Sequence, residues 1–471
     1  MWRRLARRAL WVPLALFLAT LVFPAGAALA ADKLVVWWNK GYYPEEDAAM
    51  QKIVKEFEAQ HKVEVDLSFT AQEDLLKKIT AALIARRVPD VAFCFFNDWQ
   101  VVPKFGWDDK LADTSDVIAK LKPRYNAKML EVAYVMNNKT KKRAYYGVPI
   151  EAQTMHIHYW RDLLKEAGLE DDPAKIPMKW DDYWSYWKKA QDALRRKDPA
   201  KYGKLYGIGM TESTRASDTL YNFEMALLSF NGELLDKDGK VVASQPKNRE
   251  AIIKTLTWFG DLFTSGYVPP DATNWTDGDN NAGFHSRSIV MTPNPSQSIP
   301  AAQFFNKDDP QRDNYFNKMA TIEWPNGPDG KKPRYLSAVK TIIIPKDSKS
   351  QKLAKDFILF VLEPPRFLEY IKAANGRWFP AFKDLYADPF WRTGHRGPRG
   401  EKDNHVPVAT TIFLERDNKV FEHYKHPAIS QVYDENIWGK AMARIAVEKW
   451  PADKAADEAI ERMKAIFAQY K

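Results

Sequence analysis

The chain has 471 residues, a formal net charge of +9 and a single cysteine. At roughly 150 residues per domain, this length predicts two or three domains, each with its own core. One cysteine excludes an intrachain disulfide, and basic residues alternate with acidic ones without forming a basic block, which argues against a nucleic-acid partner.

The first thirty residues have the pattern of a secretory signal peptide. Four arginines precede an apolar stretch from Ala9 to Phe23, and small residues lead up to Ala30. Pro13 and Pro24 shorten the uninterrupted apolar run below the ~20 residues of a membrane span. We therefore expect cleavage after Ala30 and export of the mature chain to the periplasm.

Strand and helix patterns alternate over the next 65 or so residues. Apolar β-formers predict strands at 34–38, 63–69 and 91–96, and apolar residues at helical spacing predict helices from Pro44 and over 75–83. This β-α-β-α-β order predicts parallel strands with helical crossovers, so the expected fold class is α/β. The only thiol, Cys94, falls in the third strand, where we expect it to be buried and inert.

Ligands bind at the carboxyl ends of parallel strands. The first strand ends at Trp38 and Asn39, and Asp98 follows the third strand. These three residues are therefore candidates for contact with a ligand.

Later segments have amphipathic helical spacing, at 180–195, 217–230, 248–265, 351–362 and 452–469. Gly232 and Gly266 stand where helix C-caps are expected. Two stretches have the composition of loops, at 293–300 and 388–407. No internal repeat divides the chain.

Motifs in a fixed order resemble one known family. They are the Pro-Asp pair before a strand at 88–91, the segments 146–151 and 159–168, the Gly-containing segments 231–240 and 259–269, the strand and loop at 282–297, and the segment 344–358. In this order and spacing the chain is similar to the large carbohydrate-binding proteins of ABC importers, which are maltose-binding-protein-like. Trp160 stands where that family usually has Asn, and the loop 293–297 lacks the Gly and Trp often found there.

The resemblance implies a two-lobe periplasmic-binding-protein fold of type II with about three segments crossing between the lobes. Lobe one is expected to comprise 32–147 and 338–373, and lobe two 148–337 and 374–471. It also implies a monomer that captures a sugar-like solute between the lobes and passes it to the transmembrane permease subunits of an ABC importer. No catalytic residue, cofactor or metal ion is expected.

By the same resemblance, Glu151 matches a position whose carboxylate accepts sugar hydroxyls. Trp275, Trp324 and Trp378 follow segments that reach the cleft in the family, and Asn294 and Ser296 lie in a polar loop after a strand. An aromatic ring can stack on a sugar or pack in a core, and a carboxylate near a hinge can be an ion-pair partner instead. Arg377 could bind a carboxylate or phosphate, or be a structural charge.

Other functions remain open from the sequence. The architecture also serves non-sugar cargo such as polyamines, peptides or iron, and acids are numerous enough for a secreted glycosidase. His156 and His158 share a face of a predicted strand, as metal ligands would, but no Cys or Glu at ligand spacing completes a metal site. The absence of nucleophile-elbow and phosphate-loop motifs favours a binding protein over an enzyme.

Overall fold

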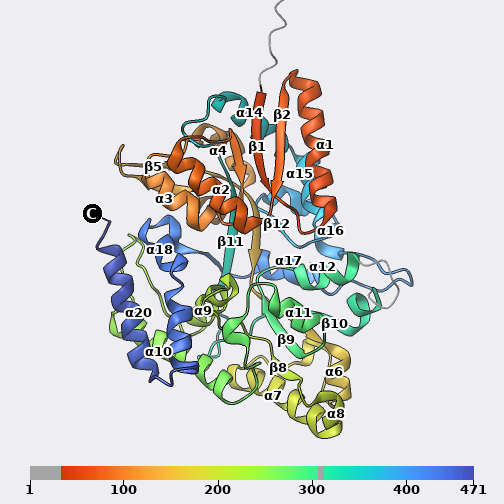
Figure 1. Ribbon diagram of the computed structural model, residues 1–471. Coiled ribbons are helices and arrows are strands. Elements are labelled where there is room, and N and C mark those ends of the chain that lie inside the picture. The colour runs from red at the N-terminus through yellow and green to blue at the C-terminus, as the bar shows by residue number, and fades with distance from the viewer. Residues whose placement is uncertain (1–32, 306–311, 471) are drawn as a thin grey trace, which may run out of the picture.

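The computed structural model describes residues 33–305 and 312–470. The predicted signal peptide and its cleavage point at Ala30 lie outside these residues. Two bodies, an upper and a lower one in Figure 1, are joined by strands that run from one into the other.

The upper body, lobe one, is built on a mixed sheet of order β12-β6-β11-β3-β1-β2, with β13 also paired to β11. The pairs β1–β2 and β1–β3 are parallel, as the strand-helix alternation predicts. Its strands are β1 Lys33–Asn39, β2 Glu64–Thr70, β3 Val91–Phe93, β6 Val148–Thr154, β11 Tyr335–Ile343, β12 Phe379–Pro380 and β13 Asn418–Val420. A separate hairpin pairs β4 Tyr134–Asn137 with β5 Lys142–Tyr145.

The helices of lobe one follow from the apolar spacing seen in the sequence. The α1 helix begins at Pro44, whose fixed backbone suits a first turn, and acidic residues follow it at the positive end of the helix. The helices are α1 Pro44–His61, α2 Gln72–Ala85, α3 Val102–Trp107, α4 Ser115–Leu121, α5 Ala127–Glu131, α14 Gln351–Val361, α15 Pro364–Ala373, α16 Phe390–Thr393 and α17 Val406–Glu415.

The lower body, lobe two, has a smaller sheet of order β10-β7-β9-β8. Its strands are β7 His156–Trp160, β8 Tyr206–Ile208, β9 Ile289–Asn294 and β10 Met319–Ile322. The helices around it are α6 Arg161–Glu166, α7 Trp180–Lys197, α8 Pro199–Tyr202, α9 Ser217–Ser229, α10 Pro246–Thr264, α11 Asp279–His285, α12 Ser298–Phe305, α18 Ala428–Asp434, α19 Ile437–Ala446 and α20 Ala452–Phe467.

Two antiparallel strands carry the chain between the lobes. Ala152 of β6 packs in the lobe-one core, whereas Met155, three residues further, packs in the lobe-two core. On β11 the change falls between Ala338 and Val339. Figure 1 shows β11 running through the junction between the two bodies.

The C-terminal segment beyond residue 374, which is predicted to belong to lobe two, contributes side chains to both cores. Trp378, Trp391 and Phe413 pack in the lobe-one core, whereas Ile412 and Phe421 pack in the lobe-two core. Helix α17 contributes to both cores because neighbouring residues on a helix point in different directions. The lobe boundary at 374 stays a prediction.

Other local features also differ from expectation. The third strand ends at Phe93, and the predicted loops at 293–300 and 388–407 contain the start of α12 and all of α16. Gly266 has the left-handed φ of +78° expected after α10, but after α9 it is Asn231 that has a positive φ. Gly232 instead lies so close to Leu227 that a Cβ atom would clash with its side chain.

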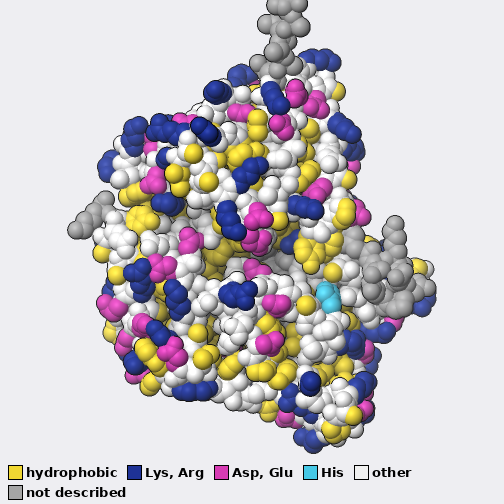
Figure 2. Space-filling view, in the orientation of Figure 1, with side chains coloured by type: hydrophobic (Ala, Val, Ile, Leu, Met, Phe, Trp, Pro, Cys, Tyr) yellow, Lys and Arg dark blue, Asp and Glu magenta, His cyan; other side chains and the backbone are white. Residues whose placement is uncertain are grey.

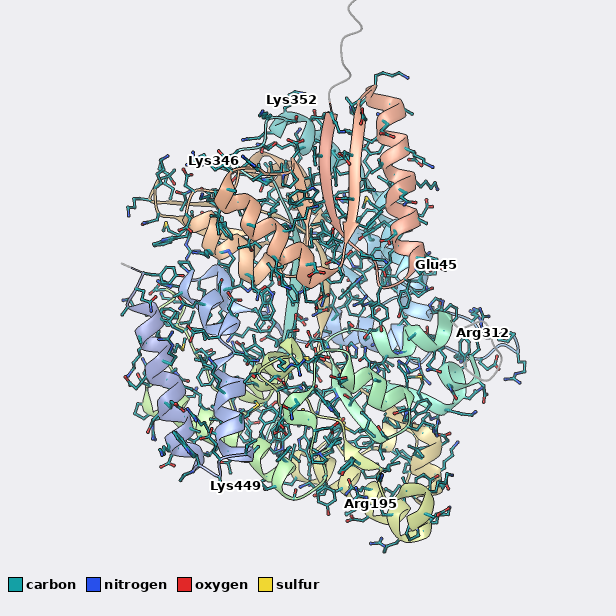
Figure 3. All side chains as sticks on the ribbon, viewed as in Figure 1. Glu45, Arg195, Arg312, Lys346, Lys352 and Lys449 are labelled. Carbon is teal, nitrogen blue, oxygen red and sulfur yellow. The ribbon has the colours of Figure 1, made fainter. Side chains whose placement is uncertain are left out.

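Charged side chains are spread around both lobes. Figure 3 shows Lys346 and Lys352 on the upper lobe and Arg195 and Lys449 on the lower one, far from one another. This distribution agrees with the alternating charges of the sequence.

The aromatic core of lobe two should depend strongly on Trp324, which is 1% exposed and packs 5.3 Å from Trp184 between ring centroids. We predict that Trp324→Ala lowers the free energy of unfolding by about 3–5 kcal/mol, because a large buried side chain is lost and a cavity remains. Urea denaturation of the mature protein measures this change. A loss below about 1 kcal/mol would contradict the buried position of this ring.

Candidate functional site

A cavity of about 610 Å³ lies between the lobes. This volume is in the range of roughly 300–1,000 Å³ that is usual for small-molecule sites. Figure 2 shows a hollow at the middle of the front face, with acidic and basic side chains gathered around it. Residues from both lobes line it.

Lobe one lines the cavity with the loops that follow its parallel strands. These are residues 39–42 after β1, 71–73 after β2 and 95–96 after β3. Asn39 ties two of the loops together, since its side chain donates to the Lys40 carbonyl over 2.8 Å and accepts from the Phe95 amide over 3.5 Å. The strand-end rule thus locates this wall of the cavity.

Lobe two lines the cavity with helix starts and one polar loop. Residues 215–221 lead into α9, 276–281 lead into α11, and 294–298 connect β9 to α12. The side chain of Ser217 donates to Asp277 over 2.7 Å, and Asn280 donates to Asp218 over 3.2 Å. Both carboxylates therefore have partners within lobe two.

The loop 294–298 rests on two buried histidines of β7. A ring nitrogen of His156 lies 3.0 Å from the Ser296 carbonyl oxygen, and one of His158 lies 3.3 Å from the same atom. Burial lowers the pKa of His156 to about 4, so the ring is neutral near pH 7. Asn294 also donates to Asn281 over 3.0 Å, which fixes the loop against α11.

An aromatic corner forms one end of the cavity. The guanidinium of Arg377 lies 4.3 Å from the ring centroid of Tyr42, 4.3 Å from that of Trp378 and 5.6 Å from that of Phe95. The rings of Phe95 and Trp378 are themselves 4.7 Å apart. Tyr42 is 50% exposed, so it keeps surface available for a ligand.

A buried charged group lies where the crossing strands meet the cavity. Lys340 on β11 is 4% exposed, and its ammonium lies 3.6 Å from Asp98 and 3.5 Å from the Tyr221 hydroxyl. Burial raises the pKa of Asp98 to about 6, although Lys340 acts in the opposite direction. Burial likewise raises the pKa of Asp218 well above its usual range, and the charge of Asp277 adds to this rise.

Five of the ten predicted ligand contacts line the cavity: Asn39, Asn294, Ser296, Arg377 and Trp378. The structure places the other five elsewhere, all of them buried: Trp38, Asp98, Glu151, Trp275 and Trp324.

These five residues are buried for different reasons. Trp38 donates to the Tyr370 hydroxyl over 3.1 Å, and Asp98 faces Lys340. Trp275 and Trp324 belong to the lobe-two core. Glu151 is 1% exposed on β6, and burial, followed by the charge of Glu46, raises its pKa to about 8.

Several cavity residues were not predicted from the sequence, among them Tyr42, Lys340, Asp218 and Tyr221. Tyr42 lies in the loop after the first strand, where the strand-end rule could have found it. Asp218 and Tyr221 stand at the start of a correctly predicted helix. Lys340 is a charged residue within the apolar run of β11, and because charged residues are rare in buried strands, it could have been predicted as a functional residue.

Among residues 33–305 and 312–470, no group of three or more His, Cys, Asp and Glu side chains is arranged to hold a metal ion. Within the same ranges, no helix combines the length and the apolar character needed to cross a membrane.

Two lobes, crossing strands and a cavity between them define the class of two-lobe solute-binding proteins. Residues 52–397 match the profile of the bacterial extracellular solute-binding proteins, and the chain belongs to this family.

Two curated relatives are also similar to the chain. A candidate binding protein of Brucella abortus is 27% identical over 218 residues, which are 46% of this chain and 46% of that protein. The arabinooligosaccharide-binding protein of Bacillus subtilis is 24% identical over 331 residues, 70% of this chain and 65% of that protein. The chain thus spans about half the length of the first of these relatives.

A solved structure is similar in fold. The ABC transporter solute-binding protein of Thermotoga lettingae, bound with α-D-tagatose, superposes with a TM-score of 0.72 and is 19% identical. The match covers 93% of this chain and 100% of that one. The two-lobe fold expected from the sequence is thereby confirmed.

The raised pKa of Glu151 predicts how stability changes with pH. Between its ordinary value of 4.5 and about 8, the native state keeps a proton that the unfolded chain has released. The free energy of unfolding should therefore fall as pH rises through this window, by up to roughly 1.4 kcal/mol per pH unit. Glu151→Gln mimics the protonated form and should flatten this dependence.

Urea denaturation of both proteins at pH 5, 7 and 8.5 tests the prediction. The variant should gain stability relative to the original chain as pH rises. Parallel pH profiles for the two proteins would contradict a protonated Glu151 in the native state.

Proposed function

We propose that the mature chain captures a sugar or sugar-like solute in the interlobe cavity and delivers it to the permease subunits of an ABC importer. The observation that carries this proposal is the cavity itself, which both lobes line with aromatic rings and fixed polar groups. The family is one of binding proteins, and the proposal includes no change to any bond of the solute.

A sugar needs flat apolar surfaces for its ring faces, and donors and acceptors for its hydroxyls. Tyr42 and Trp378 supply rings in lobe one. Asn294, Ser296 and Asp218 supply amide, hydroxyl and carboxyl groups in lobe two. A solute that uses both sets must touch both lobes.

This arrangement couples binding to closure. A solute that contacts both lobes only when they are close together shifts the equilibrium toward the closed form. The closed form then presents a distinct surface to the permease. In this proposal the protein acts as an exported monomer in the periplasm, without a cofactor.

The lining disfavours a polyamine as cargo. A polyamine site needs several acids without competing cations, whereas four basic residues line this cavity beside three acidic ones. These basic residues are Lys40, Arg215, Lys340 and Arg377. Repulsion between these cations and an amine would weaken binding.

The lobe boundaries belong to the proposal as well. We place the crossings within 152–155, 338–339 and 412–421, where side chains change from one core to the other. The functional site residues in this proposal are Asn39, Tyr42, Asp218, Asn294, Ser296, Lys340, Arg377 and Trp378.

A thermal-shift screen of the mature protein tests the proposed cargo class. A ligand that binds only the folded state raises the melting temperature, by an amount that grows with its concentration over Kd. We expect at least one mono- or oligosaccharide to raise it, with no product after long incubation. A shift with polyamines or amino acids alone, or turnover of a glycoside, would overturn the function and leave the fold intact.

Trp378→Ala should weaken sugar binding about ten-fold, since ring contacts contribute about 0.5–1.5 kcal/mol beyond the area that they bury, and about 1.4 kcal/mol corresponds to ten-fold in affinity. Isothermal titration calorimetry with the sugar found in the screen measures this change. Trp450→Ala is the matched control, because Trp450 is partly exposed and does not line the cavity. Equal affinities for the two variants would remove Trp378 from the site.

A further inference from the structure

Arg377 is a nearly buried cation, and two of its three guanidinium nitrogens make no hydrogen bond with a described residue. The residue is 8% exposed, and its Nε and Nη1 atoms have no hydrogen-bond acceptor among the described residues. It forms no ion pair with any described acid; instead, the aromatic rings of Tyr42, Phe95 and Trp378 surround it. A buried guanidinium without an acceptor is costly unless a ligand supplies one.

Lys340 is a second buried cation with weak partners. Its ammonium has three donors, but its contacts to Asp98 at 3.6 Å and to Tyr221 at 3.5 Å are longer than ordinary hydrogen bonds. Both Lys340 and Arg377 line the same cavity. Two cations with incompletely used donors thus lie at the cavity.

The carboxylates of the cavity do not neutralise these cations directly. Asp277 accepts from the Ser217 hydroxyl over 2.7 Å and from the Asp218 amide over 2.9 Å, and Asp218 accepts from Asn280. The third acid of the lining, Glu73, is exposed to solvent. The two acids of lobe two therefore form their hydrogen bonds within lobe two and form no ion pair with Lys340 or Arg377.

The acids behind Arg377 also leave much of its charge uncompensated. Glu46 and Glu151 lie within electrostatic range of it, since its charge lowers the pKa of each. Burial outweighs this effect and raises both pKa values, that of Glu151 to about 8, so that Glu151 carries a proton near pH 7. The protein interior thus supplies less negative charge here than a count of carboxyl groups suggests.

We infer that the cargo is an acidic sugar, whose anionic group binds the guanidinium of Arg377 while Lys340 binds a second oxygen of the same molecule. The inference rests on the proposed function and names its cargo class. A carboxylate and a phosphate ester both provide paired oxygens that suit a guanidinium. The hydroxyls of the sugar ring then face Asn294, Ser296 and Asp218 in lobe two.

Paired sugars that differ only in the acidic group provide the test. Calorimetric titration of the mature protein compares D-glucose with D-glucuronate and D-galactose with D-galacturonate, and D-glucose 6-phosphate tests the phosphate ester. We expect the acidic member of at least one set to bind about ten-fold or more tightly than its neutral partner. Tighter binding of the uronates identifies a carboxylate as the anionic group, and tighter binding of the sugar phosphate identifies a phosphate.

Variants show which cation is responsible. Arg377→Gln and Lys340→Gln should each lose most of the preference for the acidic sugar and change the affinity for the neutral one much less. Arg334→Gln is the matched control, because Arg334 pairs with Glu233 outside the cavity and carries the same charge. The salt dependence of binding to the unaltered protein provides a second test. Added NaCl should weaken the affinity for the acidic sugar and leave the affinity for the neutral sugar unchanged, because salt screens charge interactions.

The outcomes separate this inference from the proposed function. If neutral sugars bind as tightly as their acidic partners, the acidic-sugar inference is wrong and sugar capture stands. If no sugar of either kind binds and another solute class does, the proposed function itself is wrong. A preference for acidic sugars that survives both Arg377→Gln and Lys340→Gln would also overturn the assignment of these two residues.

Discussion

The pairing of β6 with β11 is the constraint on which the rest of the structure depends. The two strands are antiparallel neighbours from Ser337 and Thr154 at one end to Ile342 and Val148 at the other, and every residue of both is buried. β11 changes from the lobe-two core to the lobe-one core along its length, and the chain enters the lobe-two core at Met155, directly after β6. Because backbone hydrogen bonds hold the strands side by side, they fix the junction between the lobes.

Strands at this junction bring charged and aromatic side chains to the cavity. Lys340 of β11 lines the cavity, and β12, which pairs with β6, begins at Phe379, directly after Arg377 and Trp378. Burying Arg377 here without an ion-pair partner among the described residues, beside a Lys340 whose contact to Asp98 is as long as 3.6 Å, opposes folding, since a buried charge costs several kcal/mol unless it is closely paired. Such a departure from ordinary core composition is expected at a functional site, where a ligand completes what the protein leaves unpaired.

Much of the fold could be predicted from the sequence because it depends on local periodicity. The first three strands, the helix from Pro44 and the helices near 180–195 and 452–469 lie where apolar spacing placed them. The contribution of α17 to both cores could not be predicted in this way. Ile412 and Phe413 are adjacent apolar residues, and only the packed structure shows that they enter different cores.

The candidate site was predicted only in part, because tertiary packing decides which side chains point into the cavity. Trp38 and Asn39 both stand at the end of β1, yet the indole packs on Phe93 and Tyr370 while the amide lines the cavity. By sequence, Trp324 and Trp378 are equally plausible stacking residues. In the structure Trp324 belongs to a cluster of tryptophans in lobe two, whereas Trp378 lines the cavity. Residue type and strand position gave the region of the site, whereas the direction of each side chain depends on neighbours distant in sequence.

The central claim is that a solute is held between the lobes and contacts both. A crystal structure of the mature protein with the tightest-binding sugar tests it most directly. The account predicts the sugar within the cavity, in contact with Trp378 or Asn39 on one side and with Asn294 or Ser296 on the other. A sugar bound to one lobe alone would contradict it.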